Sequence, residues 1–143
     1  MACRKLFDRV QQSFSKQGLM ATLGARLLRV ESGLCEVSLP YSNRVTQQQG
    51  GFHGGAIGAV ADIAGGYAAL TVTPESMEVV TVEYKINFLN AFKDGELRAL
   101  GQVVKSGKRM IITTAEVHHV GSDDKCTLCA VLQQTIAPVP LTR

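Results

Sequence analysis

The chain has 143 residues, of which 45% are hydrophobic and 19% are charged. This balance indicates a folded domain and excludes a disordered chain, because the apolar share is large enough to bury a core. The formal net charge of +3 is too small to favour nucleic acid as a partner, since binding a polyanion requires an extended basic surface.

The first residues predict a short amphipathic helix over residues 3–16, in which Leu6, Val10 and Phe14 recur at helical spacing. Charged side chains are spread through this segment, so we expect neither a secretion signal nor a membrane span there. A loop around Gly18 is expected to follow. We therefore expect a cytoplasmic protein with no membrane partner.

Six strands and one long helix are predicted after that loop, and a polar, glutamine-rich loop over residues 41–52 leads into the helix. The strands cover residues 25–30, 35–40, 79–88, 97–105, 109–120 and 125–136, and the helix covers residues 54–71. This order predicts an α+β fold in which an antiparallel sheet is covered by one helix. We expect a single domain over residues 1–143, with its core between about residues 19 and 137.

Alternation within residues 79–88 predicts that this strand has two distinct faces. One face is expected to carry Val80, Val82, Tyr84, Ile86 and Phe88, and the other Thr81, Glu83, Lys85 and Asn87.

Four cysteines are present, and Cys126 and Cys129 match the C-x-x-C spacing of redox and zinc sites. Residues three apart in a strand point to opposite faces, so these two thiols cannot easily meet or share a metal ion. No second pair completes a zinc set. We therefore expect reduced thiols, which suit a cytoplasmic protein, and no metal site.

The predicted helix over residues 54–71 is apolar nearly all round, which is typical of a buried helix. It is built largely from glycine and alanine, which fill little volume but allow the backbone of a neighbour to come close. Each glycine costs about 1 kcal/mol in a helix relative to alanine, so several of them imply a packing or functional reason. A sheet wrapped around a slim central helix would supply that reason.

Two positions on this helix could take part in a chemical reaction. Near Gly54 the leading N–H groups lack partners within the helix and the helix dipole is positive, so this end can stabilise negative charge that develops on an oxygen. Asp62 lies among small apolar residues, where a carboxylate without a partner is costly; it is therefore either hydrogen-bonded or held for chemistry. His53, which precedes the helix, either bonds the helix backbone or contacts a substrate.

The spacing of these two positions constrains how they cooperate. At 1.5 Å of rise per residue, Gly54 and Asp62 lie about 12 Å apart along one helix, whereas reacting atoms must approach to roughly 3 to 3.5 Å. If both act on one substrate, the carboxylate must come from a second chain. This predicts sites at a twofold interface, with two sites in each dimer.

The run His53-Gly54-Gly55, the acid at Asp62 and the order of elements resemble the hotdog-fold thioesterase superfamily, and within it the PaaI-like group of phenylacetic acid degradation. The resemblance extends from roughly residue 19 to 136. It implies an antiparallel sheet wrapped around one long central helix, with a short N-terminal helix. It also implies hydrolysis of an acyl-CoA thioester without a cofactor, since coenzyme A is part of the substrate. The minimal active unit would be a homodimer, within a homotetramer that is a dimer of dimers.

The resemblance further implies a role for individual residues. The backbone N–H of Gly54 would polarise the thioester carbonyl, and Asp62 would act as general base or nucleophile. His53 would shape the loop and contact the thioester end of the substrate, while Thr81 would help to position water. Gln47 lies where many PaaI-like proteins have Asn and other hotdog thioesterases have Gln, so the placement of water and the subtype stay open.

A short basic segment matches the region where relatives contact coenzyme A. It comprises Lys105, Ser106, Gly107, Lys108, Arg109 and Met110. A glycine turn with exposed N–H groups and three flanking cations suits a pyrophosphate and a ribose phosphate, although the same pattern is found at plain charged hairpin tips. Gly55 and Phe88 fall near the substrate in relatives, although Phe88 could equally be a core residue.

Two other functions are weighed against hydrolysis. A hotdog hydratase or dehydratase would need a His-Phe-Pro-Gly motif, which this chain lacks. A non-catalytic acyl-CoA-binding protein has no need for a buried carboxylate such as Asp62. The acyl group itself is not predicted, because its pocket depends on Phe52, Ile57, Tyr67 and on residues from another chain.

Overall fold

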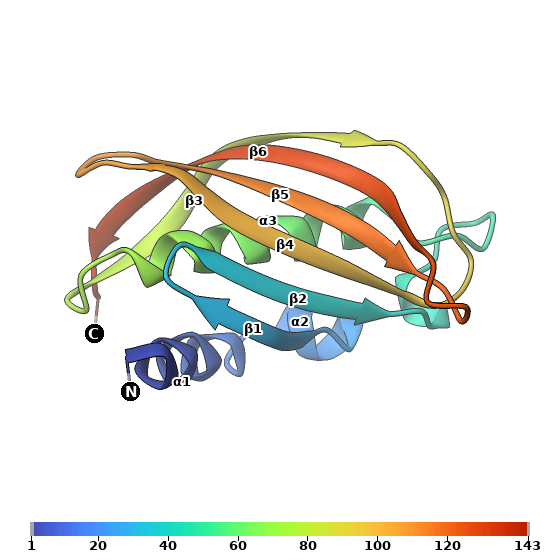
Figure 1. Ribbon diagram of the computed structural model, residues 1–143, viewed down its shortest axis with the longest axis horizontal. Helices are drawn as coiled ribbons and strands as arrows, with labels where there is room; N and C mark the ends of the chain where they lie inside the picture. The colour runs from blue at the N-terminus through green and yellow to red at the C-terminus, as the bar shows by residue number, and fades with distance from the viewer. Residues whose placement is uncertain (1, 143) are drawn as a thin grey trace.

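The structure is a computed structural model that describes residues 2–142, and it consists of one antiparallel sheet wrapped around a long helix (Figure 1). The helices are α1 (Ala2–Phe14), α2 (Gly18–Leu23), the short 3-10 helix η1 (Asn43–Val45) and α3 (Gly54–Thr71). The strands are β1 (Arg26–Glu31), β2 (Leu34–Pro40), β3 (Met77–Phe88), β4 (Glu96–Ser106), β5 (Ile111–Val120) and β6 (Cys126–Pro140).

The six strands lie in the order β1-β2-β4-β5-β6-β3, and every neighbouring pair is antiparallel. β1 and β3 are therefore the two edges of the sheet. The sheet curves around α3, and α1 and α2 lie beside β1 on the side of the helix that the sheet leaves open (Figure 1). The predicted hotdog architecture, with its short N-terminal helix, is confirmed.

α3 begins and ends where the sequence predicted. His53 has an extended backbone, and its ring Nδ1 accepts a hydrogen bond of 2.7 Å from the N–H of Gly55, so His53 is the N-cap of the helix. The helix ends at Thr71, shortly before Pro74, which cannot continue it. Its glycine and alanine positions are mostly buried, as the apolar composition predicted.

The helix and the sheet come into close backbone contact at Gly101. A side chain added at Gly101 of β4 would overlap the carbonyl of Ala64 on α3. Any residue with a Cβ would therefore push β4 away from the helix, and the glycine at this strand position is a packing requirement.

The N-terminal segment differs from the prediction in one respect. α1 matches the expected helix, but the expected loop around Gly18 is a second helix, α2, of six residues. Met20 on α2 is buried, and Gly24 ends the helix with a left-handed backbone (φ 76°). The prediction was wrong because so short a helix has too few turns for its periodicity to be recognised.

Arg9 connects α1 to the far end of α3. Its guanidinium donates to the carbonyl oxygens of Leu70 (3.0 Å), Thr73 (2.7 Å), Pro74 (2.9 Å) and Met77 (3.0 Å). These carbonyls lie in the last turn of α3 and in the turn that leads into β3, at the negative end of the helix dipole. α1 is thereby fixed against the end of the central helix.

The predicted faces of β3 are right from Glu83 onward, where Tyr84 and Phe88 lie against α3, but they are wrong for the residues before it. A β-bulge lies between Thr81 and Glu83, so that Val82 has no partner on β6. The extra residue reverses the alternation, and Thr81 therefore points toward α3, as Tyr84 does further along the strand. Strict alternation had placed Thr81 and Tyr84 on opposite faces.

All four cysteines are free thiols, and Cys126 is exposed whereas Cys129 is buried. Within residues 2–142, no helix has both the length and the apolar character to cross a membrane.

Candidate active site

Asp62 is half-buried on the side of α3 that faces β3. Its Oδ1 accepts two hydrogen bonds of 2.7 Å, one from the hydroxyl of Thr81 on β3 and one from the amide Nε2 of Gln134 on β6. No hydrogen bond from a described residue reaches Oδ2. The two hydrogen bonds therefore fix the carboxylate through Oδ1, and Oδ2 is left available to a ligand.

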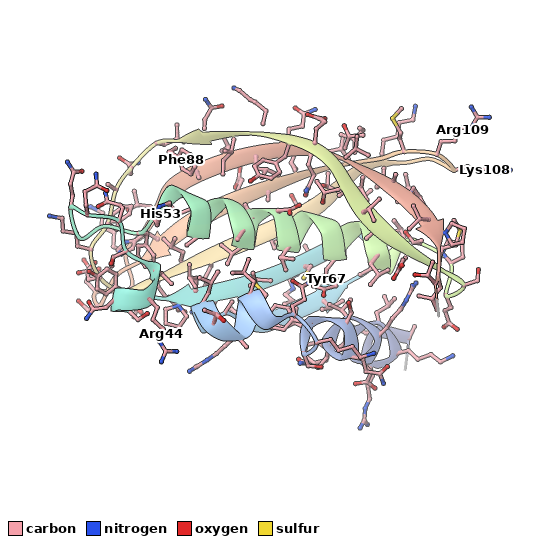
Figure 2. The ribbon with its side chains drawn as sticks, turned by 180° about the vertical axis from the view of Figure 1, so that it is seen from behind. Arg44, His53, Tyr67, Phe88, Lys108 and Arg109 are labelled. Carbon is pink, nitrogen blue, oxygen red and sulfur yellow. The ribbon has the colours of Figure 1, made fainter. Side chains whose placement is uncertain are left out.

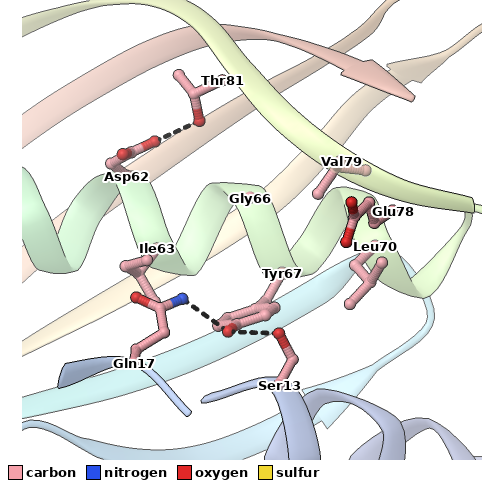
Figure 3. A pocket seen from close by; sticks show the side chains of 10 residues that line it. All are labelled: Ser13, Gln17, Asp62, Ile63, Gly66, Tyr67, Leu70, Glu78, Val79 and Thr81. Atoms are coloured by element: carbon pink, nitrogen blue, oxygen red, sulfur yellow. Dashed lines mark hydrogen bonds between the residues drawn. The ribbon is translucent and has the colours of Figure 1, made fainter. Parts of the chain in front are cut away.

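A pocket of about 160 Å³ opens beside this carboxylate, between α3, the start of β3 and the N-terminal helices (Figure 3). We call it the Asp62 pocket. It is lined by Ser13, Gln17, Asp62, Ile63, Gly66, Tyr67, Leu70, Glu78, Val79 and Thr81.

Tyr67 forms one wall of the Asp62 pocket. Its hydroxyl accepts a hydrogen bond from Gln17 Nε2 (2.7 Å) and shares another with the hydroxyl of Ser13 (2.9 Å). Burial raises the pKa of Tyr67, while these two hydrogen bonds act in the opposite direction. The sequence prediction also named Phe52 and Ile57 as pocket residues, but both are packed in the core of this chain and do not line the Asp62 pocket.

The N-terminus of α3 forms a second cluster. The ring of His53 accepts from Gly55 N–H, so its own proton is on Nε2, which is the tautomer in which Nδ1 can accept. Gly55 N–H is thereby occupied, whereas the N–H of Gly54 has no acceptor among the described residues. The ring of Phe88, at the end of β3, lies against Gly54, and Figure 2 shows Phe88 beside the start of α3, where His53 is labelled. One free backbone donor is thus presented at the positive end of the helix.

Gln47 lies in the loop before this helix. Its backbone N–H bonds the carbonyl of Gly51 at 2.9 Å, and its side-chain Oε1 accepts from the N–H of Gln49. The amide side chain therefore shapes the loop that carries His53, and only its Nε2 end is left without a partner among the described residues.

The structure thus separates the predicted catalytic residues into two groups on one chain. His53, Gly54 and Gly55 lie at the start of α3, whereas Asp62 and Thr81 meet more than two helical turns further along.

The predicted coenzyme A segment forms the exposed tip between β4 and β5. Lys108 and Arg109 lie at the end of the molecule opposite His53 (Figure 2). Gly107 and Lys108 border the same hollow as Val72 and Pro74, which places this tip beside the end of α3. The 18 residues of α3 therefore separate the tip from Gly54 by about 27 Å of helix.

β3 leaves one edge of the sheet unpaired, and this edge is unusually apolar. Val80, Val82, Tyr84 and Phe88 are between 43% and 60% exposed. A long apolar edge strand offers both backbone donors and acceptors and a hydrophobic surface to another strand.

The sequence reasoning missed Gln134, which is 1% exposed and bonds the carboxylate of Asp62. It is one of two adjacent glutamines in β6, and Gln133 points outward. Only the period-2 alternation of the strand distinguishes them, since Leu132 and Ile136 are buried on the same side as Gln134. The pocket residues Ser13 and Gln17 were also missed, because they come from segments far from α3 in the sequence.

The family model of the thioesterase superfamily matches residues 49–126 of the chain. A solved structure of a thioesterase family protein from Silicibacter pomeroyi is 35% identical, with 95% of this chain and 99% of that chain covered and a TM-score of 0.90. The 1,4-dihydroxy-2-naphthoyl-CoA hydrolase of Escherichia coli is 24% identical, and the match covers 94% of this chain and 96% of that protein. The E. coli PaaI protein of the phenylacetic acid degradation operon has the same fold, with a TM-score of 0.85 at 20% identity over 99% of both chains.

Proposed function

The chain belongs to the thioesterase superfamily and is a thioester hydrolase, and we propose that it hydrolyses an acyl-CoA at sites shared between two copies of the chain. The observation that supports this most directly is the arrangement on α3. A carboxylate with one free oxygen and a backbone N–H with no acceptor lie on one helix, eight residues apart.

In the proposed reaction, the thioester carbonyl oxygen accepts a hydrogen bond from the N–H of Gly54, which stabilises the oxyanion as the carbonyl carbon is attacked. Acting as general base, Asp62 takes a proton from water through Oδ2, and the water oxygen forms the new bond to that carbon. Alternatively, Oδ2 attacks directly, and water then cleaves the resulting anhydride. In both routes the carbon–sulfur bond breaks, and the products are the free acid and the thiol of coenzyme A.

A homodimer formed through β3 would bring the two half-sites together. β3 runs antiparallel to α3, with Phe88 against Gly54 and Thr81 against Asp62. If two copies of β3 pair antiparallel about a twofold axis, a register that sets Phe88 opposite the partner's Thr81 also brings Gly54 toward the partner's Asp62. The apolar, unpaired edge of β3 supports this pairing. A homotetramer that is a dimer of dimers stays a prediction from the family resemblance.

The same antiparallel arrangement explains the distance between the basic tip and Gly54 in one chain. In the dimer, the β4–β5 tip with Lys108 and Arg109, which lies beside the end of α3, would lie toward the start of the partner's helix, where the thioester is held. Three cations at a glycine turn suit the phosphates of coenzyme A, and one relative is by name a CoA hydrolase. We propose no further cofactor, and a cytoplasmic location, with which the four free thiols agree.

The test is release of coenzyme A from a panel of aryl, short-chain and long-chain acyl-CoAs by the wild type and by Asp62→Asn. The amide keeps the size of the side chain but cannot act as a base or nucleophile. We expect the variant to bind coenzyme A as the wild type does and to lose turnover by at least roughly 100-fold. An Asp62→Asn enzyme as active as the wild type would exclude the proposed role of the carboxylate.

A further inference from the structure

We infer that Gln134 is a positioning residue for the reaction, acting through Asp62, and that Thr113 in turn fixes the orientation of Gln134. This inference rests on the proposed function, because it assigns Gln134 a role only if Asp62 is the reacting carboxylate. It begins from a continuous line of hydrogen bonds. The hydroxyl of Thr113 on β5 lies 2.8 Å from Oε1 of Gln134, and Nε2 of Gln134 lies 2.7 Å from Oδ1 of Asp62.

The chemistry of the three groups determines which atom donates and which accepts in each of these hydrogen bonds. An ionised carboxylate only accepts hydrogen bonds, so the NH₂ end of the Gln134 amide must face Asp62. The carbonyl end then faces Thr113, whose hydroxyl must donate. Gln134 and Thr113 are 1% and 0% exposed, so no water competes for either group. Reversing the amide would set two acceptors against each other in a buried site.

The packing of α3 leaves room for this amide. Gly65 lies three residues after Asp62 and therefore on the same side of the helix. A Cβ at Gly65 would overlap the amide of Gln134 and crowd the hydroxyl of Thr113. A glycine that weakens the helix thus allows a side chain from β6 to cross the helix surface and reach the carboxylate.

The consequence is that the two oxygens of Asp62 are not equivalent. Oδ1 receives donors from β3 and β6 and is fully engaged, whereas Oδ2 receives none from the described residues and is the one available to water or substrate. Two donors on Oδ1 also fix the rotation of the carboxylate plane. Gln134 therefore helps to set the direction in which Oδ2 points.

Few other groups can titrate near Asp62. The titratable side chains that face it are Tyr67 of α3 and two residues of β3, Glu78 in the same pocket and Tyr84 against the helix. The segments of α1, β5 and β6 that approach it present the uncharged residues Ser13, Thr113 and Gln134. In a shared site the partner's His53 would also approach Asp62, so a shift in the acid limb of the pH profile is assigned by comparison with a control variant that leaves all of these groups unchanged.

The experiment compares Gln134→Glu with Gln133→Glu in the full-length protein. Gln134→Glu keeps the shape and the acceptor for Thr113 but replaces the donor to Asp62 with a second carboxyl group. Two carboxyl groups that share a proton cannot both ionise readily. We expect kcat for acyl-CoA hydrolysis near neutral pH to fall roughly 100-fold, the loss that follows misplacement of a reacting group, with KM little changed. The acid limb of kcat should move to higher pH.

Gln133→Glu makes the same chemical change on the outward face of the same strand and should retain the wild-type kcat and pH profile. If Gln134→Glu does not fold, as judged by thermal unfolding, Thr113→Val replaces it, because that change removes only the hydroxyl that orients the amide. Thr113→Val should lower kcat, and Thr113→Ser, which restores a hydroxyl, should recover it.

Asp62→Asn, assayed in parallel, separates the two conclusions. If Asp62→Asn is inactive while Gln134→Glu keeps the wild-type kcat and acid limb, the proposed function stands and the inference about Gln134 is overturned. If Gln134→Glu does not fold and Thr113→Val has the wild-type kcat, the inference about Gln134 is likewise overturned. If Asp62→Asn is fully active, the proposed function fails and the inference falls with it.

Discussion

The hydroxyl of Thr81 lies 2.7 Å from Oδ1 of Asp62, and it reaches the carboxylate only because β3 bulges at the next residue, Val82. In a regular strand, Thr81 and the helix-facing Tyr84 would point to opposite sides of the sheet. The bulge therefore allows one strand to supply both a donor to the carboxylate and an aromatic wall against the helix.

Thr81→Val should lower kcat by roughly 10- to 100-fold, because a hydrogen bond to a charged group contributes about 1.5 to 3 kcal/mol. Steady-state acyl-CoA hydrolysis measures this, and Thr81→Ser should retain most of the activity. Thr135→Val is the matched control, since Thr135 bonds Glu83 on the outer face of the sheet, away from Asp62. A Thr81→Val enzyme with wild-type kcat would show that this donor is dispensable.

Gly54→Pro should abolish the oxyanion donor while keeping the helix. Proline is well tolerated at the first position of a helix, and the residue before it, His53, already has the extended backbone that proline requires. We expect kcat to fall by roughly 10²- to 10³-fold. Gly54→Ala adds the same Cβ, which crowds the exposed ring of Phe88, but keeps the N–H and should stay active.

Mixing Gly54→Pro with Asp62→Asn tests whether sites are shared. Random exchange of subunits would make half of the dimers mixed, and each mixed dimer would contain one intact site, so activity should recover to about a quarter of the wild-type rate. Native mass spectrometry confirms that subunits have exchanged. If exchange occurs without recovery, each chain must complete its own site.

Substitutions at His53 separate its capping role from contact with substrate. His53→Ala removes the acceptor for Gly55 N–H and should lower the free energy of unfolding by about 1 kcal/mol, whereas His53→Asn supplies another cap and should be nearly neutral. Urea unfolding measures both. If His53→Asn is as stable as the wild type but loses turnover, the ring itself takes part in the reaction; if turnover is unchanged, His53 serves the helix alone.

Arg9→Met should destabilise the protein by about 2 to 3 kcal/mol, because it leaves four backbone carbonyls without their charged donor. Arg9→Lys should recover only part of this, since an ammonium group cannot reproduce the planar fork. Burial lowers the pKa of Arg9, an effect that nearby Glu75 opposes. A guanidinium is effectively always protonated in proteins, because its ordinary pKa lies far above neutrality. Chemical denaturation provides the measurement, with exposed Arg4→Met on the same helix expected to be close to neutral.

The thiols should differ sharply in reactivity. Burial raises the pKa of Cys35 to about 12 and also raises that of Cys129, so both remain protonated at pH 8, where the thiolate is the reactive form. Cys3 and Cys126 are exposed. A thiol reagent at pH 8 should therefore modify two cysteines in the native protein and four after unfolding. Rapid modification of Cys35 in the native state would contradict the buried position.

The stability linked to Cys35 has a defined sign. The pKa of Cys35 in the folded protein lies above the ordinary value of 9.0, so folding favours the neutral thiol. Below pH 9.0 this contribution to stability is complete. This contribution is lost as pH rises from 9.0 toward about 12.

The central helix was predictable because its limits follow from local chemistry. His53 supplies a cap, Pro74 stops the chain, and the glycine and alanine run between them is apolar on every side. Asp62 stood out for the same reason, since a carboxylate within such an apolar run needs a partner or a function, and its role in the reaction stays a proposal.

The remaining features depend on contacts that no local pattern reports. The bulge at Val82 inserts one residue into an otherwise regular alternation, and hydrophobicity alone gives no sign of it. Gln134 binds a carboxylate 72 positions earlier in the chain, so its role becomes visible only when β6 is placed beside α3. The proposed pairing of two chains through β3 likewise lies beyond what one sequence determines.

The contact between Gly101 and Ala64 has a practical consequence for mutational scanning. Every substitution at Gly101 introduces a Cβ that meets the helix backbone, so this position should tolerate no other residue. A Cβ at Gly65 would instead meet the side-chain amide of Gln134 and displace it from Asp62, so substitution there should also lower activity. In a scan scored by activity, these two glycines would rank with Asp62, although neither touches a reacting atom. Soluble yield, scored alongside activity, would distinguish glycines that hold the helix in place from residues that carry out the reaction.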